Sequence, residues 1–392
     1  MKQIHPFLIV SEGRYSLPVK IWASHIEESA SEQIKNLSML PFAFSHIAIM
    51  PDCHMGYGMP IGGVLATRNV VIPNAVGVDI GCGMCATTTS LKELDTETLK
   101  TIMGEIRKIV PVGFNHQAEP QDLNLMPEVD ECMVIIAREF KSATRQIGTL
   151  GGGNHFIEIQ KGSDGYIWIM IHSGSRNLGK QVADYYNKLA VAMNERWQST
   201  VPKAWQLAFL PTDSLEGADY ISEMNYCVNF ALANRRLMMN NICNIMASVT
   251  GCEFSPMINI AHNYAAMEHH FGENVMVHRK GATLARVGTT GIIPGSMGSS
   301  SYIVDGLGNP DSFHSCSHGA GRIMSRTAAQ KNLNLANEIE ILNRQGIIHG
   351  IRNEKDLDEA PGSYKNIDDV MENQKDLVST AVKLTPLGGI KG

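Results

Sequence analysis

The chain has no long hydrophobic run at its amino terminus and no excess of positive charge. The segment MKQIHPFLIV holds only a short apolar run before Ser11, which is too brief for the core of a signal peptide or for a membrane span. We therefore expect a cytoplasmic protein that does not enter a membrane. Lys and Arg total 33 against 39 acidic residues, a net charge of -6. This balance argues against a generally basic nucleic-acid coat and leaves only a local cationic patch for contact with nucleic acid.

The cysteines do not form the dense framework of a small disulfide-rich protein. Eight cysteines are scattered over 392 residues, and the pair Cys82 and Cys85 has no second C-x-x-C at the spacing of a zinc ribbon. We expect most of them to be reduced residues of the core. The sequence also lacks internal repeats, low-complexity tracts and Pro/Ser-rich linkers. We therefore predict one domain over residues 1–392.

Strand-like and helix-like segments alternate along the chain, which predicts a mixed α/β fold. Apolar runs that lead into polar, glycine-rich loops are typical of strands, and they lie at 44–50, 85–90, 156–160, 166–172 and 274–282. Apolar residues at helical spacing predict helices, at 95–106, 129–146, 180–197 and 219–249. Asp95 is placed to cap the first of these helices. By composition alone, the terminal GGIKG would be taken for a disordered tail.

Residues of metal-binding types gather in short loops, flanked by glycine, at the predicted strand ends. They are Asp79, Cys82, Asn154, His155, His172, His262 and Asn263. A thiolate, several imidazoles and a carboxylate make a borderline-soft ligand set that suits manganese, zinc or iron. Glycines on both sides of D-x-x-C let Asp79 and Cys82 reach one ion, and a thiolate that bridges two ions suits phosphoryl chemistry. Any single histidine is more often a hydrogen-bonded structural residue than a ligand.

A second group of motifs has the features of a phosphate-binding cradle. PGSMGSSS, at 294–301, supplies small residues whose amides can form an anion-binding nest, and HGAGR places His318 directly before a predicted helix start. A neutral imidazole beside an α-phosphate can attack it and form a phosphoramidate. The residues alone slightly favour a plainer interpretation, in which HGAGR is only a helix start with a capping histidine.

Six basic residues lie in or next to these loops, although the chain as a whole is acidic. They are Arg176, His278, Arg279, Lys280, Arg322 and Arg326. Arginine forks and lysine ammonium groups bind terminal phosphates and the RNA backbone. Each of them alone is more often a solvated surface residue. Together they predict a cationic cleft on an acidic protein.

Nine motifs, in order from residue 51 to the final glycine, resemble those of the RtcB family of RNA ligases. They are PDCHMGYGMPIGGV, VGVDIGCGM, GGGNHFIE, HSGSRNLG, INIAHNYA, HRKGAT, PGSMG, SCSHGAGR and GGIKG. The resemblance implies a large α/β domain whose strand-end loops form one central cleft for metal and nucleotide. It also implies a ligase that joins an RNA 3′-phosphate or 2′,3′-cyclic phosphate to a 5′-hydroxyl, with GTP and manganese, through a histidine-GMP intermediate.

The resemblance also implies a role for individual residues. It makes His318 the nucleophile that carries GMP, and it implies two manganese ions, with Cys82 shared, held by Asp79, Cys82, His155, His172 and His262. Guanine-nucleotide contacts are expected at Asn154, Glu158, Asn263, Ser296, Gly319, Ala320, Gly321, Tyr364 and Lys391. Contacts with RNA are expected at Arg176, Arg279, Lys280 and Arg322.

The chain departs from the family pattern on the side that is expected to face RNA. Leu284 and His314 stand where many relatives carry arginine and asparagine, and the stretch between HRKGAT and PGSMG is short. These changes concern substrate preference more than chemistry. Two rival functions use the same residues: a dinuclear metal-dependent phosphatase or nuclease that acts on RNA ends without GTP, and a non-catalytic RNA-end binder. The physiological RNA, tRNA exons or damaged RNA, and the need for an archease-type activator stay open.

Overall fold

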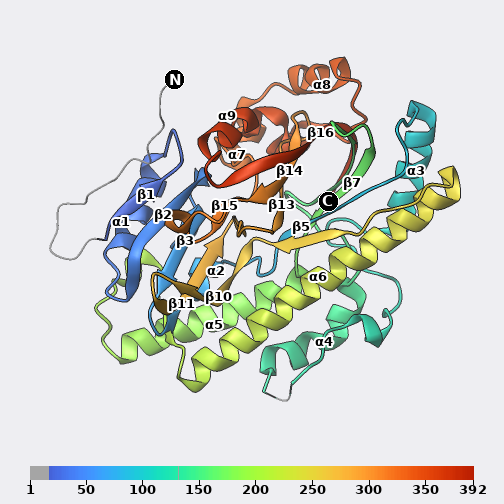
Figure 1. Cartoon of the computed structure of the whole chain (residues 1–392). Coiled ribbons are helices and arrows are strands. Elements are labelled where there is room, and N and C mark those ends of the chain that lie inside the picture. The colour runs from blue at the N-terminus through green and yellow to red at the C-terminus, as the bar shows by residue number, and fades with distance from the viewer. Residues whose placement is uncertain (1–16, 131) are drawn as a thin grey trace.

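The computed structural model describes residues 17–130 and 132–392, in which strands and helices alternate along the chain (Figure 1). This alternation confirms the predicted mixed α/β class. The apolar run near the amino terminus, on which the expectation about signal peptides and membrane spans rests, lies outside the described residues. Among the helices of the described ranges, none has both the length and the apolar character needed to cross a membrane.

One sheet has five strands in the order β1-β2-β3-β11-β10, in which β1 pairs with β2 in parallel and the other pairs are antiparallel. The strands are β1 Val19–Ile21, β2 Ala43–His54, β3 Ile61–Thr67, β11 Glu273–Lys280 and β10 Asn263–His270. Helix α1, Glu28–Ser38, buries Ile34 and Leu37 in the apolar cluster that this sheet shares. The predicted strand 44–50 ends directly before Pro51, but β2 continues to His54, because a shift of register between Ile49 and His54 carries the strand past the proline.

A second sheet has seven strands, with the order β13-β14-β16-β6-β7-β5-β9. The strands are β13 Thr290–Ile293, β14 Ser301–Gly306, β16 Val378–Lys391, β6 Phe156–Gly162, β7 Ile167–Ser173, β5 Gly83–Thr88 and β9 Ile258–Ala261. The carboxyl-terminal strand lies inside this sheet, and Lys391 is paired with Phe156. A disordered tail is therefore wrong for GGIKG, since its backbone hydrogen bonds are made with β6.

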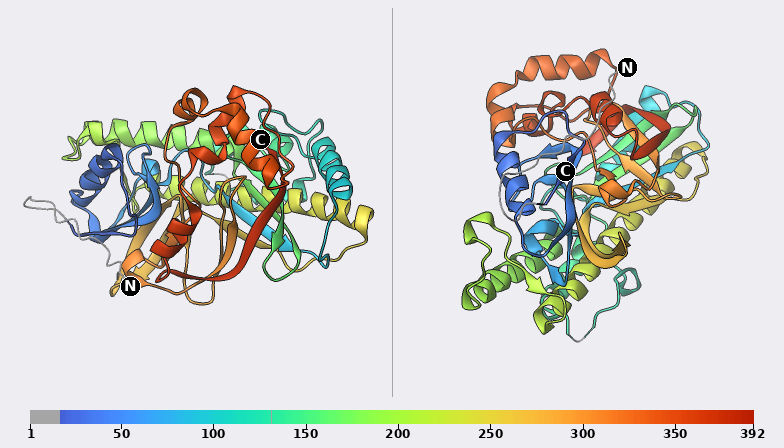
Figure 2. Two further views of the ribbon diagram at one scale, coloured as in Figure 1. Left: turned by 90° about the horizontal axis from the view of Figure 1, so that it is seen from above. Right: turned by 60° about the vertical axis from the view of Figure 1, so that its left-hand side comes forward.

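The long helices are α3 Thr96–Ile109, α4 Val134–Gln146, α5 Arg176–Arg196 and α6 Leu215–Thr250. Two of these four, α3 and α6, pack on the second sheet, and the other two, α4 and α5, pack on each other and on α6. Asp95 caps α3 as predicted and accepts hydrogen bonds from the amides of Glu97 and Thr98. Helices α5 and α6 run alongside each other (Figure 2). Methionines of α6 fill the core, Met238 and Met246 among them. Helix α5 begins at Arg176, earlier than predicted, so part of SGSRNLG is helical.

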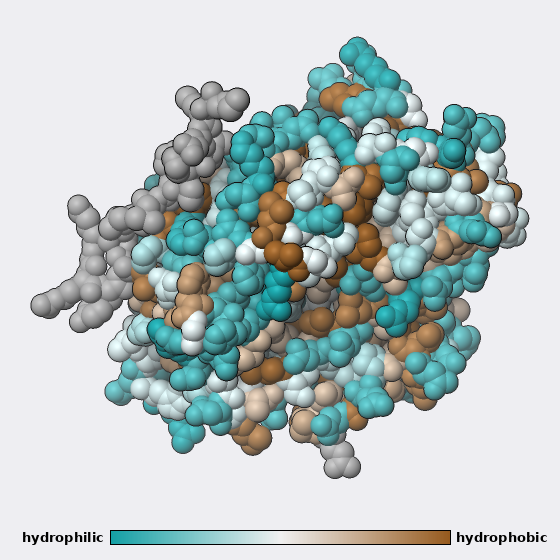
Figure 3. Space-filling model, viewed as in Figure 1, coloured by the Kyte–Doolittle hydropathy of each residue, from teal (hydrophilic) through white to brown (hydrophobic). Residues whose placement is uncertain are grey.

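Short elements complete the fold and carry several of the loops. They are β4 Val70–Val71, α2 Pro73–Val76, β8 Leu210–Pro211, β12 Ala282–Leu284, β15 Ser315–Ser317, α7 Arg326–Asn332, α8 Leu335–Arg344 and α9 Ile367–Asn373, with short 3-10 helices at Leu123–Leu125, Lys203–Trp205, Pro310–Ser312, Glu354–Glu359 and Pro361–Ser363. Gly281, with φ of 60°, breaks the predicted strand 274–282 into β11 and β12. The face in Figure 3 is mostly hydrophilic, with hydrophobic residues in small groups.

Candidate metal and nucleotide centre

Loops and strand ends from both sheets line one cavity of about 830 Å³. All of the predicted metal ligands and nucleotide contacts line it, and so do His318, Lys280 and Arg322; the ligands and contacts are Asp79, Cys82, His155, His172, His262, Asn154, Glu158, Asn263, Ser296, Gly319, Ala320, Gly321, Tyr364 and Lys391. Arg176 and Arg279 are not among the residues that line the cavity in the described part of the chain. The fold thus brings together loops that are far apart in the sequence.

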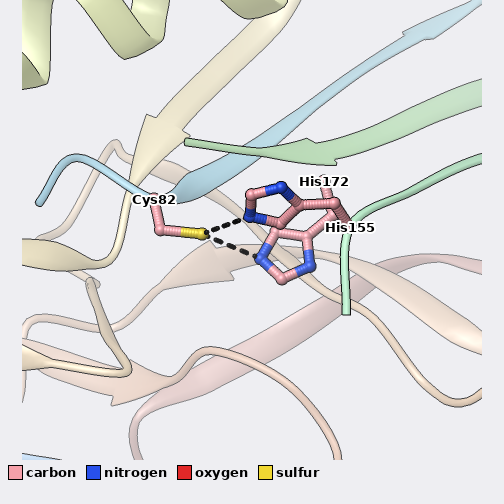
Figure 4. Close-up of side chains that lie close together, drawn as sticks. All are labelled: Cys82, His155 and His172. Atoms are coloured by element: carbon pink, nitrogen blue, oxygen red, sulfur yellow. Dashed lines mark hydrogen bonds between the residues drawn. The ribbon is translucent and has the colours of Figure 1, made fainter. Parts of the chain in front are cut away.

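Cys82, His155 and His172 form a buried cluster (Figure 4), and all three line the cavity. Cys82 lies just before β5, His155 just before β6, and His172 in β7, and these three strands are adjacent in the sheet. The Cys82 Sγ atom lies 3.5 Å from Nε2 of His155 and 3.2 Å from Nε2 of His172. One sulfur and two imidazole nitrogens within 4.8 Å of one another are a suitable donor set for a transition-metal ion.

Backbone carbonyls fix the orientation of both imidazoles. Nδ1 of His155 lies 2.9 Å from the carbonyl oxygen of Leu150, and Nδ1 of His172 lies 3.0 Å from that of Asn154. A ring that donates its Nδ1 proton in this way keeps a lone pair on Nε2, which is the arrangement of metal-binding histidines. Burial lowers the pKa of His172 well below its usual value and so favours the neutral ring that a ligand needs.

The charges of Asp79 and Cys82 also fit a cation. Burial alone would raise the pKa of Asp79, but its contact with the His155 ring, with 3.4 Å between Oδ2 and Nε2, contributes to a net lowering to about 2. Burial and the nearby Asp79 raise the pKa of the Cys82 thiol well above its usual value. A metal ion at Sγ would reverse this shift, because thiolate ligands lose their proton on binding.

Arg235, which the motifs did not indicate, holds the loops that carry these ligands. Its guanidinium is fully buried and donates to the carbonyl oxygens of Gly81, at 3.0 Å, and Ser173, at 2.7 Å. Gly81 directly precedes Cys82 in the chain, and Ser173 directly follows His172. Arg235 lies in the middle of α6, where helical periodicity gave no sign of a polar role.

His262 connects the cluster to His318. Its ring centroid lies 5.2 Å from that of His172 and 4.8 Å from that of His318. Burial lowers the pKa of His262 well below its usual value, and its buried Nδ1 has no hydrogen-bond partner within the described ranges. An unsatisfied buried nitrogen is costly unless a ligand completes it. The neighbouring Asn263 is already engaged, because its side chain donates to the Asp79 carbonyl and accepts from the Gly281 amide.

His318 is held by a carboxylate that the sequence did not single out. Nδ1 of His318 lies 2.6 Å from Oδ2 of Asp52, and the same oxygen accepts hydrogen bonds from the amides of His318 and Gly319, at 3.0 and 3.3 Å. Asp52 is fully buried in β2, within the PDCH part of the first motif. This contact leaves Nε2 of His318 available to a reaction partner.

The predicted helix start at HGAGR is wrong. Residues 318–325 are not helical, and α7 begins only at Arg326. Gly321 has φ of 75°, and a Cβ atom there would lie 2.3 Å from the carbonyl oxygen of Asp52. The chain therefore turns tightly against β2 instead of entering a helix, and no helix N-terminus faces a ligand at His318.

The loop PGSMGSSS satisfies several of its own amides. The amides of Gly295, Ser296 and Gly298 donate to the hydroxyls of Ser301, Ser299 and Ser296. Ser296 is the serine of this loop that lines the cavity, and an anion would have to displace these internal bonds to use the amides.

Ion pairs and acidic side chains occupy the part of the cavity expected to bind nucleotide. Nζ of Lys391 lies 2.8 Å from Oδ1 of Asp358, and the Tyr364 hydroxyl donates to Glu359. Glu359 also forms ion pairs with Arg322 and Arg326, each at 3.1 Å. These two acids lie outside every motif, so only the fold identifies them. Separately, burial raises the pKa of Glu158 in β6 to about 8.

The four predicted RNA contacts have different environments. Nζ of Lys280 lies at the cavity wall and donates to the carbonyl oxygens of Tyr57 and Asn74, and burial lowers its pKa to about 7. The Arg176 guanidinium donates to Thr149 and to the Gly113 carbonyl.

Arg279 requires a correction. Its side chain is fully buried, forms a bidentate ion pair with Glu268, and donates to Ser315 and to the Phe313 carbonyl. The structure gives it a role in the fold instead of a contact with RNA, because none of these donors faces solvent. Leu284 and His314, the two departures from the family pattern, flank the same region: Leu284 pairs with Ser315, the residue after His314.

Comparisons with known proteins agree with the motifs. A family model described as tRNA-splicing ligase RtcB matches residues 33–139 and 128–392. The chain is 39% identical to the RNA-splicing ligase RtcB of Escherichia coli strain K12 over 96% of this chain and 97% of that protein. It is 33% identical to the RNA-splicing ligase RtcB of Mycobacterium tuberculosis, over 92% of this chain and all of that protein. It is 30% identical to the tRNA-splicing ligase RtcB of Methanococcus maripaludis, over 98% of both.

Proposed function

The chain belongs to the RtcB family, and we propose that it is an RNA ligase that uses GTP and manganese to join a 3′-phosphate or 2′,3′-cyclic phosphate end to a 5′-hydroxyl end. One observation carries the proposal: His318, held by Asp52, shares a cavity with the Cys82, His155 and His172 cluster, and His262 lies between them. A nucleophile for phosphorus and a metal site thus lie within reach of the same substrate.

We assign the metal site to five residues: Cys82, His155, His172, Asp79 and His262. The first three are the cluster itself, Asp79 is in contact with His155, and His262 has a buried nitrogen that lacks a partner. Bound manganese would orient phosphate groups and offset the negative charge that develops on them. The Cys82 Sγ atom lies close to the Nε2 atoms of both His155 and His172. A thiolate with ligands on two sides is suited to contact two ions, which supports the proposal that Cys82 is shared.

The proposed nucleophile is Nε2 of His318. This atom would form a bond to the α-phosphorus of GTP while the bond to the leaving pyrophosphate breaks. Asp52 accepts a hydrogen bond from the Nδ1–H group and so stabilises the positive charge that the ring acquires. GMP would then pass from His318 to the RNA 3′-phosphate, and the 5′-hydroxyl would displace GMP as the new phosphodiester bond forms.

Residues on both sides of His318 are proposed to hold the substrates. Those assigned to GTP are Asn154, Glu158, Asn263, Ser296, Gly319, Ala320, Gly321, Tyr364 and Lys391, all of which line the cavity. Lys280 and Arg322, which line the cavity, and Arg176, which does not, are assigned to RNA phosphates. Lys391 and Arg322 pair with Asp358 and Glu359, so the proposal requires that bound GTP replaces Asp358 at Lys391 and that RNA replaces Glu359 at Arg322.

Ligation of defined RNA ends tests the proposal. We expect joining of a 3′-phosphate strand to a 5′-hydroxyl strand that requires both GTP and a divalent metal, with manganese the most effective. A metal-dependent phosphatase or nuclease has the same ligands but no use for GTP. Phosphate release or cleavage that is independent of GTP, without joined product, would therefore contradict the proposal. Binding of RNA ends without turnover under any metal would contradict it as well.

A further inference from the structure

Three large apolar side chains are exposed at the rim of the cavity. Met55, Tyr57 and Val78 line it and are 56%, 70% and 46% exposed. Tyr57 is the most exposed tyrosine in the described part of the chain. Burial of an aromatic ring is normally favourable, so a group of exposed apolar side chains at a binding cavity indicates a surface that a ligand covers.

The backbone beneath the Tyr57 ring is fixed on several sides. The Tyr57 carbonyl accepts hydrogen bonds from Nζ of Lys280, at 2.6 Å, and from the amide of Met59, at 2.8 Å. Gly58 has φ of 69°, and a Cβ atom there would lie 2.5 Å from the carbonyl oxygen of Gln206. The ring therefore projects from a rigid loop, and little conformational freedom would be lost when a ligand covers it.

The loop that holds Tyr57 contains none of the residues that the proposed function assigns to GTP. The loop of Tyr57 connects β2 and β3 of the five-stranded sheet, whereas Glu158 and Lys391 belong to β6 and β16 of the seven-stranded sheet. Lys280 joins this loop to the metal side. Its Nζ atom donates to the Tyr57 carbonyl, and its Cε atom packs against Gly77, two residues before Asp79, where an added Cβ atom would lie only 3.1 Å from it. A strand that covers Tyr57 would therefore have its end close to the proposed metal ligands.

We propose that Tyr57 is a stacking platform for the terminal base of a single-stranded RNA end, with Met55 and Val78 as its apolar edge. The inference rests on the proposed ligase function and extends it to a specific substrate contact. Aromatic side chains hold unpaired RNA bases by stacking, and stacking tolerates every base because each has a π face. An aromatic ring at the rim suits an enzyme that must accept RNA ends of differing sequence.

The test uses the full-length protein and short RNA oligomers that carry 2-aminopurine. In one oligomer the fluorescent base precedes a 3′-phosphate, and in the other it follows a 5′-hydroxyl. Stacking on Tyr57 should quench the fluorescence of one of the two, which identifies the strand that occupies the platform. Tyr57→Phe should retain the quenching. Tyr57→Leu, which keeps apolar bulk without a ring, should lose it and weaken binding of that oligomer roughly ten- to a hundredfold.

Tyr185→Ala is the matched control, since Tyr185 is an exposed tyrosine on α5 that does not line the cavity. Wild-type affinity and quenching in Tyr57→Leu would overturn the assignment, and so would equal losses of RNA binding in Tyr57→Leu and Tyr185→Ala.

Covalent labelling of the protein by GTP without RNA separates this inference from the function on which it rests. Tyr57→Leu should label like the wild type, and loss of the label with loss of binding would indicate a disturbed cavity and overturn the platform. An unlabelled wild type would contradict the ligase mechanism but leave the RNA-binding result to be judged by itself.

Discussion

The two halves of the cavity differ in how their polar groups are satisfied. On the metal side, Cys82 and the Nε2 atoms of His155 and His172 face one another, and only their Nδ1 atoms are engaged by the backbone. On the nucleotide side, Lys391 and Tyr364 already pair with Asp358 and Glu359. The metal side is thus arranged for a ligand that adds to it. The nucleotide side is arranged for a ligand that exchanges with existing partners. Substitutions there should therefore reduce activity less, and they should act on the affinity for GTP.

The largest effect should follow from loss of the shared metal ligand. Cys82→Ala should lower metal content and reduce ligation about a hundredfold or more. Cys85→Ala is the matched control, because Cys85 is buried in the same strand region but belongs to the apolar core. Elemental analysis and ligation assays on both variants measure the difference. Equal metal content in Cys82→Ala and the wild type would remove Cys82 from the proposed site.

The next largest effect should come from Asp52→Asn, which keeps the size of the side chain but removes its charge. We expect transfer of GMP to His318 to slow by roughly 100- to 10,000-fold, because the ring loses the carboxylate that stabilises its charged form. Metal content should not change, since Asp52 contacts His318 and not the cluster. A normal rate of GMP transfer would show that Asp52 only supports the fold.

On the nucleotide side, Lys391→Ala should raise KM for GTP by about tenfold with a smaller change in kcat, because one charge-assisted contact is removed. Asp358→Asn tests the exchange directly: release of Lys391 from its acidic partner should leave GTP binding equal or tighter. Steady-state kinetics with GTP as the varied substrate distinguish the two outcomes. A large fall in kcat with unchanged KM in Lys391→Ala would contradict the proposed division between the halves.

The last effect concerns the stability of the fold at different pH values and not the rate of ligation. Burial raises the pKa of Glu158 from 4.5 to about 8, so the folded protein binds a proton that the unfolded chain has released between these values. The wild type should therefore lose stability as pH rises from about 4.5 to 8, by at most about 1.4 kcal/mol per pH unit. Glu158→Gln should flatten this dependence in thermal unfolding at several pH values. Parallel curves for the two proteins would contradict a neutral Glu158.

The sequence predicted the loop residues of the centre better than the contacts that hold them. Strand-end loops with glycine placed Cys82, His155 and His172 correctly near one cavity, because short loops at strand ends are positioned by the sheet itself. Asp52 was missed because Pro51 was taken as the end of β2, and only the irregular register of β2 with β3 shows that the strand continues. The role of Arg279 was predicted incorrectly because its partner, Glu268, lies on the adjacent strand β10. Such contacts depend on strand pairing, which no local pattern contains. The extent of a single domain stays a prediction.

Covalent labelling by GTP tests the central claim most directly. The protein is incubated with manganese and GTP labelled at the α-phosphorus, and the label is then mapped. We expect a label that is stable in alkali and lost in acid, as a phosphorus–nitrogen bond on histidine requires. His318→Ala should abolish the label, and Tyr185→Ala should retain it. A wild-type protein that takes up no label, or a label that persists in His318→Ala, would contradict the account.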